Sequence, residues 1–174
     1  MKKHSDPLTK TIPSSDVSKT KASVSKAATF PVVGIGASAG GLEALEQFFV
    51  NMPPNSGMAF VVVQHLDPDR KGIMRELLQR FTAMTVLTVT DRLKLKPNAV
   101  YVIPPNKSMS VLNGVLHLFS PVESRGLRLP VDFFFRSLAE EQKHNSIGVI
   151  LSGMGSDGSI GLKAIKEAAG IAAV

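Results

Sequence analysis

From Phe30 to the last residue, short apolar runs alternate with segments of helical periodicity, and this alternation constrains the fold more than any other feature. The apolar runs, such as 59–64 and 147–151, are rich in β-branched residues, which is typical of strands buried on both faces. Between them, apolar residues recur at helical spacing, as in 41–50. Strand, loop and helix units repeated in this order predict an α/β fold with a mainly parallel, doubly wound sheet and helices on both faces.

The same patterns predict the individual elements of the chain. The dipeptide Asn113-Gly114 is the one that two-residue hairpin turns prefer, so a β-hairpin is expected near 109–118. We expect strands at 31–36, 59–64, 85–90, 99–103, 147–151 and 171–174, and helices at 41–50, 73–81, 130–143 and 159–169.

The helix expected at 130–143 is the longest of these. Pro130 suits its first turn, because a proline there loses no intrahelical hydrogen bond. We expect Phe133, Phe134 and Leu138 on its buried side.

Residues 1–29 differ in composition from the rest of the chain. They are Ser, Thr and Lys with two prolines and no aromatic residue, too little apolar surface to offset the entropy of ordering. We therefore predict a disordered Lys/Ser/Thr-rich tail at 1–29 and one folded domain at 30–174. The first 30 residues hold six lysines and two aspartates, and the whole chain has a net charge of only +6. A near-neutral domain without a basic stripe gives no support to nucleic-acid binding.

Several classes of protein are disfavoured by what the sequence lacks. It has no cysteine, which removes disulfides, thiolate nucleophiles and cysteine-based zinc sites and agrees with a reducing compartment. No apolar run reaches the roughly 18 to 20 residues that span a bilayer, and no secretory h-region is present. We expect a cytoplasmic protein without membrane insertion.

The loop after the first predicted strand contains the pattern G-x-S-x-G at 36–40. In this pattern Ser38 would sit on a sharp strand-to-helix turn, and the helix that follows would direct free N–H groups toward a developing anion. The same string also fits a glycine-rich phosphate loop or a purely structural turn. The motif alone leaves a nucleophile, nucleotide binding and a structural turn open.

The second predicted strand ends in Gln64-His65, followed by Asp67 and Asp69. His65 is placed to act as a general base if Ser38 is adjacent in space, and the alternative is a half-buried histidine bonded to its own loop. The string His-x-Asp-x-Asp could also bind a metal, but no second cluster completes a coordination shell. We expect neither a metal nor a cofactor.

Asp157 lies in the glycine-rich loop after the strand at 147–151. It could cap the helix that follows, or it could hold the imidazole of His65 in the correct tautomer. The carboxyl ends of parallel strands share one edge, so Ser38, His65 and Asp157 could converge there. Their order along the chain differs from the Ser, Asp, His order of α/β-hydrolases.

At these residues the chain resembles the catalytic domain of the bacterial chemotaxis protein-glutamate methylesterases, over roughly residues 31–174. The resemblance implies that Ser38 is the nucleophile, His65 the general base and Asp157 its orienting carboxylate. It also implies an oxyanion hole made by the backbone N–H groups of Ala39 and Met154. The most specific matching segments are 34–41, 63–65, 101–105 and 151–158.

The reaction implied by the resemblance is hydrolysis of γ-glutamyl methyl esters on methylated chemoreceptor helices, often with deamidation of selected glutamines. Two other functions stay open. One is an inactive receptor-docking or regulatory module of the same fold. The other is nucleotide binding through 34–41, which is disfavoured because the second strand ends in Gln64-His65 rather than in a ribose-binding acid.

Two segments, 130–140 and 161–167, look more like the esterase domains that begin methylesterase/methyltransferase fusion proteins. The sequence ends at Val174 inside a predicted strand, where the family continues. We therefore expect 30–174 to be a methylesterase catalytic domain truncated at its C-terminal end, with a fused methyltransferase module as a partner.

Overall fold

The computed structural model describes Met1 and residues 29–38, 40–64, 73–121, 128–152 and 156–174, so most of the predicted tail lies outside the described residues. Among these residues, six strands form one sheet in the order β3-β5-β2-β1-β8-β9, and every neighbouring pair is parallel. Its strands are β1 (Val32–Ala37), β2 (Ala59–Gln64), β3 (Thr85–Thr88), β5 (Ala99–Val102), β8 (Ser146–Ser152) and β9 (Ile171–Ala173).

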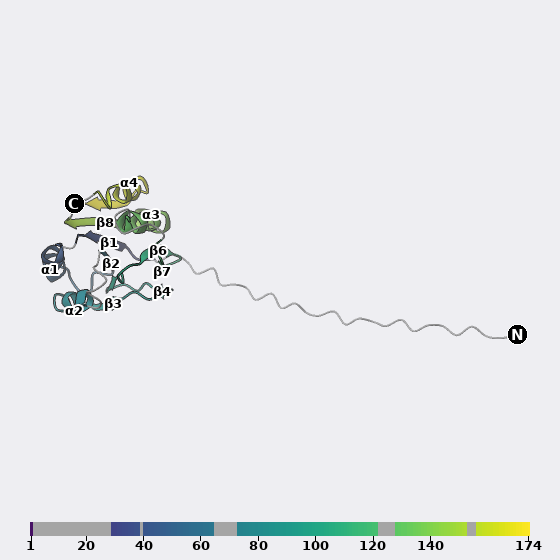
Figure 1. Cartoon of the computed structure of the whole chain (residues 1–174), viewed down its shortest axis with the longest axis horizontal. Coiled ribbons are helices and arrows are strands. Elements are labelled where there is room, and N and C mark those ends of the chain that lie inside the picture. The colour runs from purple at the N-terminus through teal and green to yellow at the C-terminus, as the bar shows by residue number, and fades with distance from the viewer. Residues whose placement is uncertain (2–28, 39, 65–72, 122–127, 153–155) are drawn as a thin grey trace.

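Helices cover both faces of this sheet, as predicted. Figure 1 shows α1 and α2 on one side of the central strands and α3 and α4 on the other. The short 3-10 helix η2 (Lys143–Asn145) follows α3. The four α-helices of the described residues are α1 (Leu42–Val50), α2 (Ile73–Gln79), α3 (Pro130–Gln142) and α4 (Ser159–Glu167).

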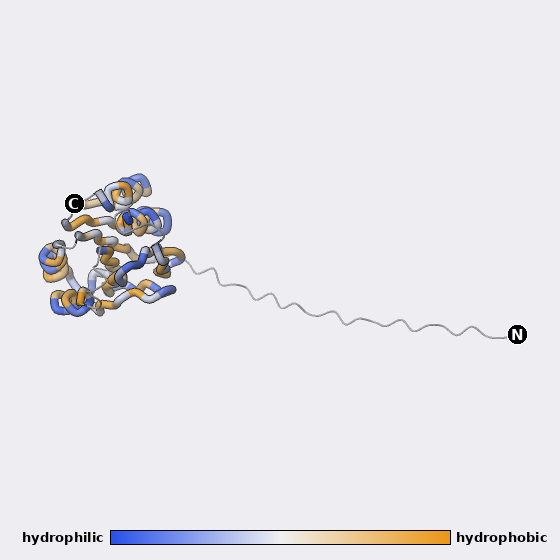
Figure 2. The backbone as a smooth tube through the Cα atoms, in the orientation of Figure 1, coloured by the Kyte–Doolittle hydropathy of each residue, from blue (hydrophilic) through white to orange (hydrophobic). Residues whose placement is uncertain are grey.

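The side chains of β1 alternate between two apolar layers. Val33 and Ile35 belong to a buried cluster with Leu45 of α1, whereas Val32 belongs to a second cluster with Phe135 of α3. Every residue of β1 and β2 is buried, as expected for central strands covered on both faces. Figure 2 shows that the helices carry both hydrophilic and hydrophobic positions around their turns, which matches one face packed on the sheet and one facing outward.

The prediction for the buried side of α3 was partly wrong. Phe134 and Leu138 are fully buried, but Phe133 is 44% exposed and Phe135 is buried in its place. Besides Pro130 and Asp132 in the first turn, the buried positions of α3 are 131, 134, 135, 138, 139 and 142, which form one stripe of a 3.6-residue period. Phe133 lies outside that stripe, because successive helix positions are rotated by about 100°.

A smaller antiparallel sheet lies beside α3 and contains the predicted hairpin. Its order is β4-β7-β6, and both residues of the two-residue turn, Asn113 and Gly114, have positive φ values of 53° and 71°, as this turn requires. The amide N–H of Val111 donates to Ser137 Oγ of α3 at 3.1 Å. The three strands are β4 (Leu93–Lys94), β6 (Ser108–Leu112) and β7 (Val115–Phe119).

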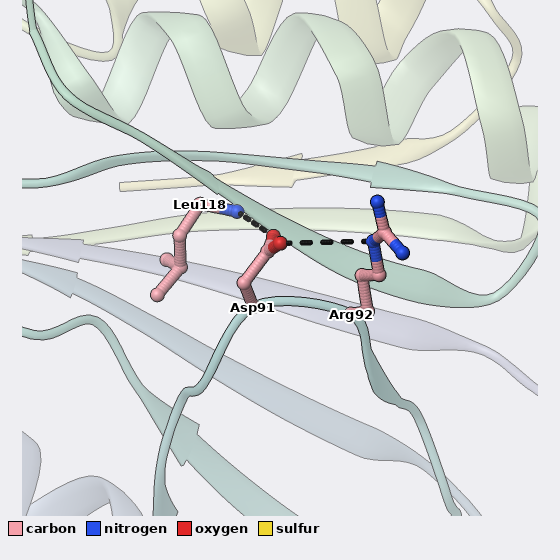
Figure 3. A network of polar contacts seen from close by, with 3 residues as sticks. All are labelled: Asp91, Arg92 and Leu118. Atoms are coloured by element: carbon pink, nitrogen blue, oxygen red, sulfur yellow. Dashed lines mark hydrogen bonds and ion pairs between the residues drawn. The ribbon is translucent and has the colours of Figure 1, made fainter.

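Asp91 completes the hydrogen bonding of this small sheet (Figure 3). Strand β4 pairs with β7 only at Leu116 and Val115. The N–H of Leu118, further along β7, donates to Asp91 Oδ1 at 3.0 Å. This hydrogen bond lowers the pKa of Asp91, and the charge of Arg92, whose Nε lies 3.8 Å from Asp91 Oδ2, lowers it further.

Within the ranges that the structure describes, none of the helices has the length and apolar character needed to cross a bilayer.

Candidate active site

Strands β2, β1 and β8 lie side by side, and their carboxyl ends meet at one edge of the sheet. In the strand register, Ala37 of β1 is paired with both Gln64 of β2 and Ser152 of β8. Ser38 directly follows Ala37, and His65 directly follows Gln64. Because all the pairings are parallel, the loops after these three strands leave from the same edge, where α/β proteins place their sites.

Ser38 sits on a tight turn between β1 and α1. Its backbone N–H donates to the carbonyl oxygen of Ser152 at 3.0 Å, and its carbonyl oxygen accepts from the N–H of Gly41 at 2.9 Å. Helix α1 begins at Leu42, so the chain passes from strand to helix within four residues of Ser38. The serine is half-buried, and hydrogen bonds fix both its backbone N–H and its carbonyl group.

The Gln64 side chain is a further support of this turn. Its Nε2 donates to the carbonyl oxygen of Ser38 at 2.5 Å, and the residue is only 4% exposed. Its Oε1 is buried and has no hydrogen-bond partner within the described part of the chain. Gln64 was not among the predicted site residues, although a polar amide at the end of an otherwise apolar strand is a detectable signal.

A second hydroxyl lies next to that of Ser38. Ser152 Oγ is 3.4 Å from Ser38 Oγ, and either atom can donate. A Cβ built on Gly41 would lie 2.6 Å from Ser152 Oγ, so the absence of a side chain at Gly41 leaves room for this hydroxyl. Ser152 was also absent from the predicted site, because nothing local in the sequence distinguishes it from an ordinary strand-end serine.

Asp157 holds the start of α3 rather than the start of its own helix. Its Oδ2 accepts from the N–H of Val131 at 3.1 Å, and its Oδ1 accepts from the N–H of Asp132 at 2.9 Å. The N-cap of α4 is Gly158, and no side chain caps that helix. The alternative that Asp157 caps the helix after it is therefore wrong, and the carboxylate instead binds the first turn of α3, with Asp132 lying 25 residues earlier in the chain. Free N–H groups and the positive end of the helix dipole both stabilise a carboxylate at this position.

Asp132 of α3 forms a hydrogen bond with α4. Its Oδ1 accepts from the N–H of Gly161 in the first turn of α4 at 2.6 Å, and the residue is 5% exposed. Asp157 thus binds the first turn of α3, the helix that carries Asp132. Asp132 in turn binds the first turn of α4, the helix that follows Asp157. This exchange of hydrogen bonds fixes α3 and α4 relative to each other at the site edge.

The start of α3 also lies against the end of β1. A Cβ built on Gly36 would be 2.6 Å from Cγ1 of Val131, and one built on Gly158 would be 3.0 Å from the same atom. Val131 therefore packs between the strand that leads to Ser38 and the turn that carries Asp157. The structure brings these two predicted site residues to the same edge of the sheet.

The other predicted site residues, His65, Ala39 and Met154, lie outside the described residues, as do Asp67 and Asp69. In the ranges that are described, no group of three or more His, Cys, Asp or Glu side chains is arranged to hold a metal ion.

The described residues define a three-layer α/β protein with polar side chains gathered at the carboxyl edge of a parallel sheet. The model of the CheB methylesterase family matches residues 33–174, so the chain belongs to that family. Membership confirms the resemblance, the fold class and the predicted enzyme class, a carboxylic ester hydrolase.

Known proteins resemble the chain in sequence and in structure. A relative from Leptospira interrogans serogroup Icterohaemorrhagiae serovar copenhageni (strain Fiocruz L1-130) is 32% identical over 146 residues, which cover 83% of this chain and 76% of the relative. The protein-glutamate methylesterase/protein-glutamine glutaminase of Desulfitobacterium hafniense (strain Y51) is 35% identical, and the match covers 81% of this chain but only 37% of that protein. The crystal structure of the Thermotoga maritima CheB methylesterase catalytic domain matches with a TM-score of 0.75 at 32% identity, over 83% of this chain and 79% of that one.

Proposed function

We propose that the chain is a serine esterase that hydrolyses γ-glutamyl methyl esters on the helices of chemoreceptors, releasing glutamate and methanol. The observation that carries the proposal is the position of Ser38, on a hydrogen-bonded turn at the carboxyl edge of β1, in a chain of the CheB methylesterase family. Nucleotide binding has no comparable support, and family membership does not favour an inactive docking module.

The proposed reaction is acyl transfer in two halves. In the first half, His65 takes the proton of Ser38 Oγ as that oxygen attacks the ester carbonyl, and then gives the proton to the departing methanol. In the second half, water attacks the acyl-enzyme with His65 again as base, and Ser38 is regenerated. The N–H groups of Ala39 and Met154 are the proposed donors to the oxyanion, where loss of one donor typically costs about 10²–10³ in rate.

Asp157 is the proposed partner of His65. A carboxylate has about four lone-pair positions, and two of those on Asp157 accept from Val131 and Asp132. The negative charge that would stabilise a protonated His65 is therefore itself held by two peptide N–H groups. This arrangement fixes the orientation of the Asp157 carboxylate.

Deamidation of receptor glutamines is a second reaction that the same residues could perform. The relatives from Desulfitobacterium hafniense and Pseudomonas aeruginosa are named for both a methylesterase and a glutaminase activity. Attack of Ser38 on a glutamine side chain would give the same acyl-enzyme with ammonia as leaving group.

We also propose a cytoplasmic location and a methyltransferase module in the same protein. The location follows from the proposed substrate, since methylated receptor helices lie on that side of the membrane. Support for the module comes from the similarity of 130–140 and 161–167 to esterase domains of such fusions.

The test is the substitution Ser38→Ala, assayed by methanol release from methylated receptor. We expect the rate to fall by at least about 10³-fold, because nucleophile and base act as one unit in serine hydrolases. Thermal melting should be little changed, since the backbone hydrogen bonds of Ser38 do not involve its side chain. Unchanged methanol release would refute Ser38 as the nucleophile.

A further inference from the structure

Four large apolar side chains are exposed around one hollow at the starts of α3 and α4. They are Phe119 at the end of β7, Leu129 just before α3, Phe133 on α3 and Ile160 on α4, and their exposed fractions lie between 44% and 57%. The hollow that they line has a volume of about 440 Å³ and is named the Phe133 hollow below. Clustered apolar side chains that stay in contact with water mark interaction sites more often than single ones do.

The Phe133 hollow adjoins the candidate active site. Phe133 directly follows Asp132, whose N–H donates to the carboxylate of Asp157. Ile160 comes three residues after Asp157, and Asp132 itself lines the hollow. A molecule seated in the hollow would therefore lie beside the turn that carries Asp157.

Two of the aromatic rings that line the hollow form a pair. Phe119 and Phe133 contact each other edge to face, with ring centroids 6.0 Å apart and an interplanar angle of 75°. Such a pair is fixed before any partner arrives, so little side-chain entropy would be lost on binding. Exposed aromatic anchors of this kind supply much of the affinity of protein interfaces.

The rim of the hollow is positively charged. Arg128 and Arg136 line it, and Lys107 lies at its edge, where its Nζ donates to the hydroxyl of Ser120, a lining residue. The acid that lines the hollow, Asp132, is buried and uses Oδ1 to bind α4. Among the described residues, the exposed charge around the hollow is thus basic, which complements an acidic partner and would repel a second copy of the same surface.

Addition of a partner as a β-strand is restricted on the β4 side of the small sheet. Strand β7 lies between β4 and β6, and beyond β4 the N–H of Leu118 is already bound by Asp91 (Figure 3). On the other side of β7, the strand β6 is an edge of the sheet, and the N–H of its Val111 donates to Ser137 Oγ of α3. The exposed apolar side chains line a hollow rather than a strand edge, which suits a helix whose apolar side chains at i, i+3 and i+4 enter the hollow.

We propose that the Phe133 hollow docks the substrate itself, an amphipathic receptor helix rich in glutamate. Its apolar side chains fill the hollow, a glutamate of the helix pairs with Arg136, and an esterified glutamate further along the helix reaches Ser38. This proposal rests on the proposed function, because it names the surface that presents the ester to the same site. Its volume falls within the roughly 300–1,000 Å³ of ordinary ligand pockets.

The test separates docking from chemistry with two variants of the full chain, Phe133→Ala and Arg136→Glu. For methylated receptor we expect each to raise KM about tenfold and to leave kcat within about twofold, since neither side chain touches the reacting ester. The effect of Arg136→Glu should shrink as salt is raised, because it acts through exposed charges. Matched controls are Leu112→Ala and Arg80→Glu, which change an exposed apolar residue and an exposed arginine away from the hollow.

The possible outcomes are distinct. If the wild type releases no methanol from receptor, the proposed function fails and the docking proposal fails with it. If the wild type is active and the hollow variants match their controls in KM, docking at the hollow is overturned while the esterase stands. If light scattering shows a wild-type dimer that Phe133→Ala dissociates, a second copy is the occupant and the helix proposal is wrong. Thermal melting detects a misfolded Phe133→Ala, in which case Arg136→Glu, on an exposed position, decides.

Discussion

At the scale of single residues, Gln64 is a side chain whose role was not predicted from the sequence. Its amide holds the carbonyl of Ser38, while its own Oε1 is buried without a partner among the described residues. A buried amide kept in this state weakens the fold and fixes the turn of the proposed nucleophile. Ser38 could be predicted because the glycines that frame its turn are its neighbours in the sequence. They did not locate Gln64 or Ser152, because those contacts cross from one strand to another.

We predict that Gln64→Leu separates activity from stability. Removing the amide frees the Ser38 carbonyl, so kcat should fall about tenfold or more with little change in KM, as for a group that orients a reacting residue. Melting temperature should stay equal or rise, because the unpartnered buried Oε1 is removed. Gln142→Leu is the matched control, since Gln142 is also 4% exposed and also has amide atoms without a partner among the described residues. Gln142 is the last residue of α3, at the end of that helix away from the site. The control should share the effect on melting and not the effect on kcat. A Gln64→Leu enzyme with normal kcat would contradict the positioning role.

At the scale of elements, the contact between α3 and α4 depends on a residue without a side chain. A Cβ built on Gly161 would lie 2.5 Å from Cβ of Phe135 and 3.2 Å from Cα of Asp132. We predict that Gly161→Ala lowers the free energy of unfolding by about 1–3 kcal/mol, as overpacking does, even though alanine favours helices by about 1 kcal/mol. Urea unfolding measures this. Lys163→Ala, on the exposed side of α4, is the control and should change stability by less than about 0.5 kcal/mol. An equal effect of both substitutions would show that α3 and α4 are not tightly packed.

The small sheet gives a prediction about pH. The N–H of Leu118 is the main cause that lowers the pKa of Asp91. Burial opposes this effect to a smaller extent, and the charges of Arg92 and His117 lower the pKa further. A carboxyl whose pKa is lowered by folding contributes stability above its unfolded pKa of about 3.9 and loses it as pH falls through the lower folded value. The melting temperatures of wild type and Asp91→Ala should therefore differ between pH 5 and 7 and converge below about pH 4. A gap that does not depend on pH would mean that the charge of Asp91 does not matter. Glu140→Ala, at an exposed position of α3, serves as the control.

At the scale of the whole molecule, much of the fold could be predicted from the sequence. Apolar runs without polar alternation predicted the strands of the large sheet, and segments of helical period predicted the helices of its two covering layers. These patterns are predictive because they reflect burial on one or both sides. Strand β4 was missed, because two residues carry no period. The exposure of Phe133 was missed because the width of a helix's buried stripe depends on how many neighbours it packs against. Of the two roles left open for Asp157, a cap on the helix that follows is wrong, because Asp157 binds the first turn of α3 instead. That tertiary contact between distant segments has no local sequence pattern.

The double attachment of Asp157 has a consequence for how such sequences change over generations. The carboxylate stabilises the start of α3 whether or not any ester is cleaved. A lineage that lost its esterase activity would still be under selection to keep this aspartate, because its loss would weaken the fold. Ser38 has no such protection, since its side chain is dispensable for the turn that carries it. Among descendants of this domain, the serine is therefore the residue whose replacement records the loss of catalysis, and a retained aspartate records only that the protein still folds.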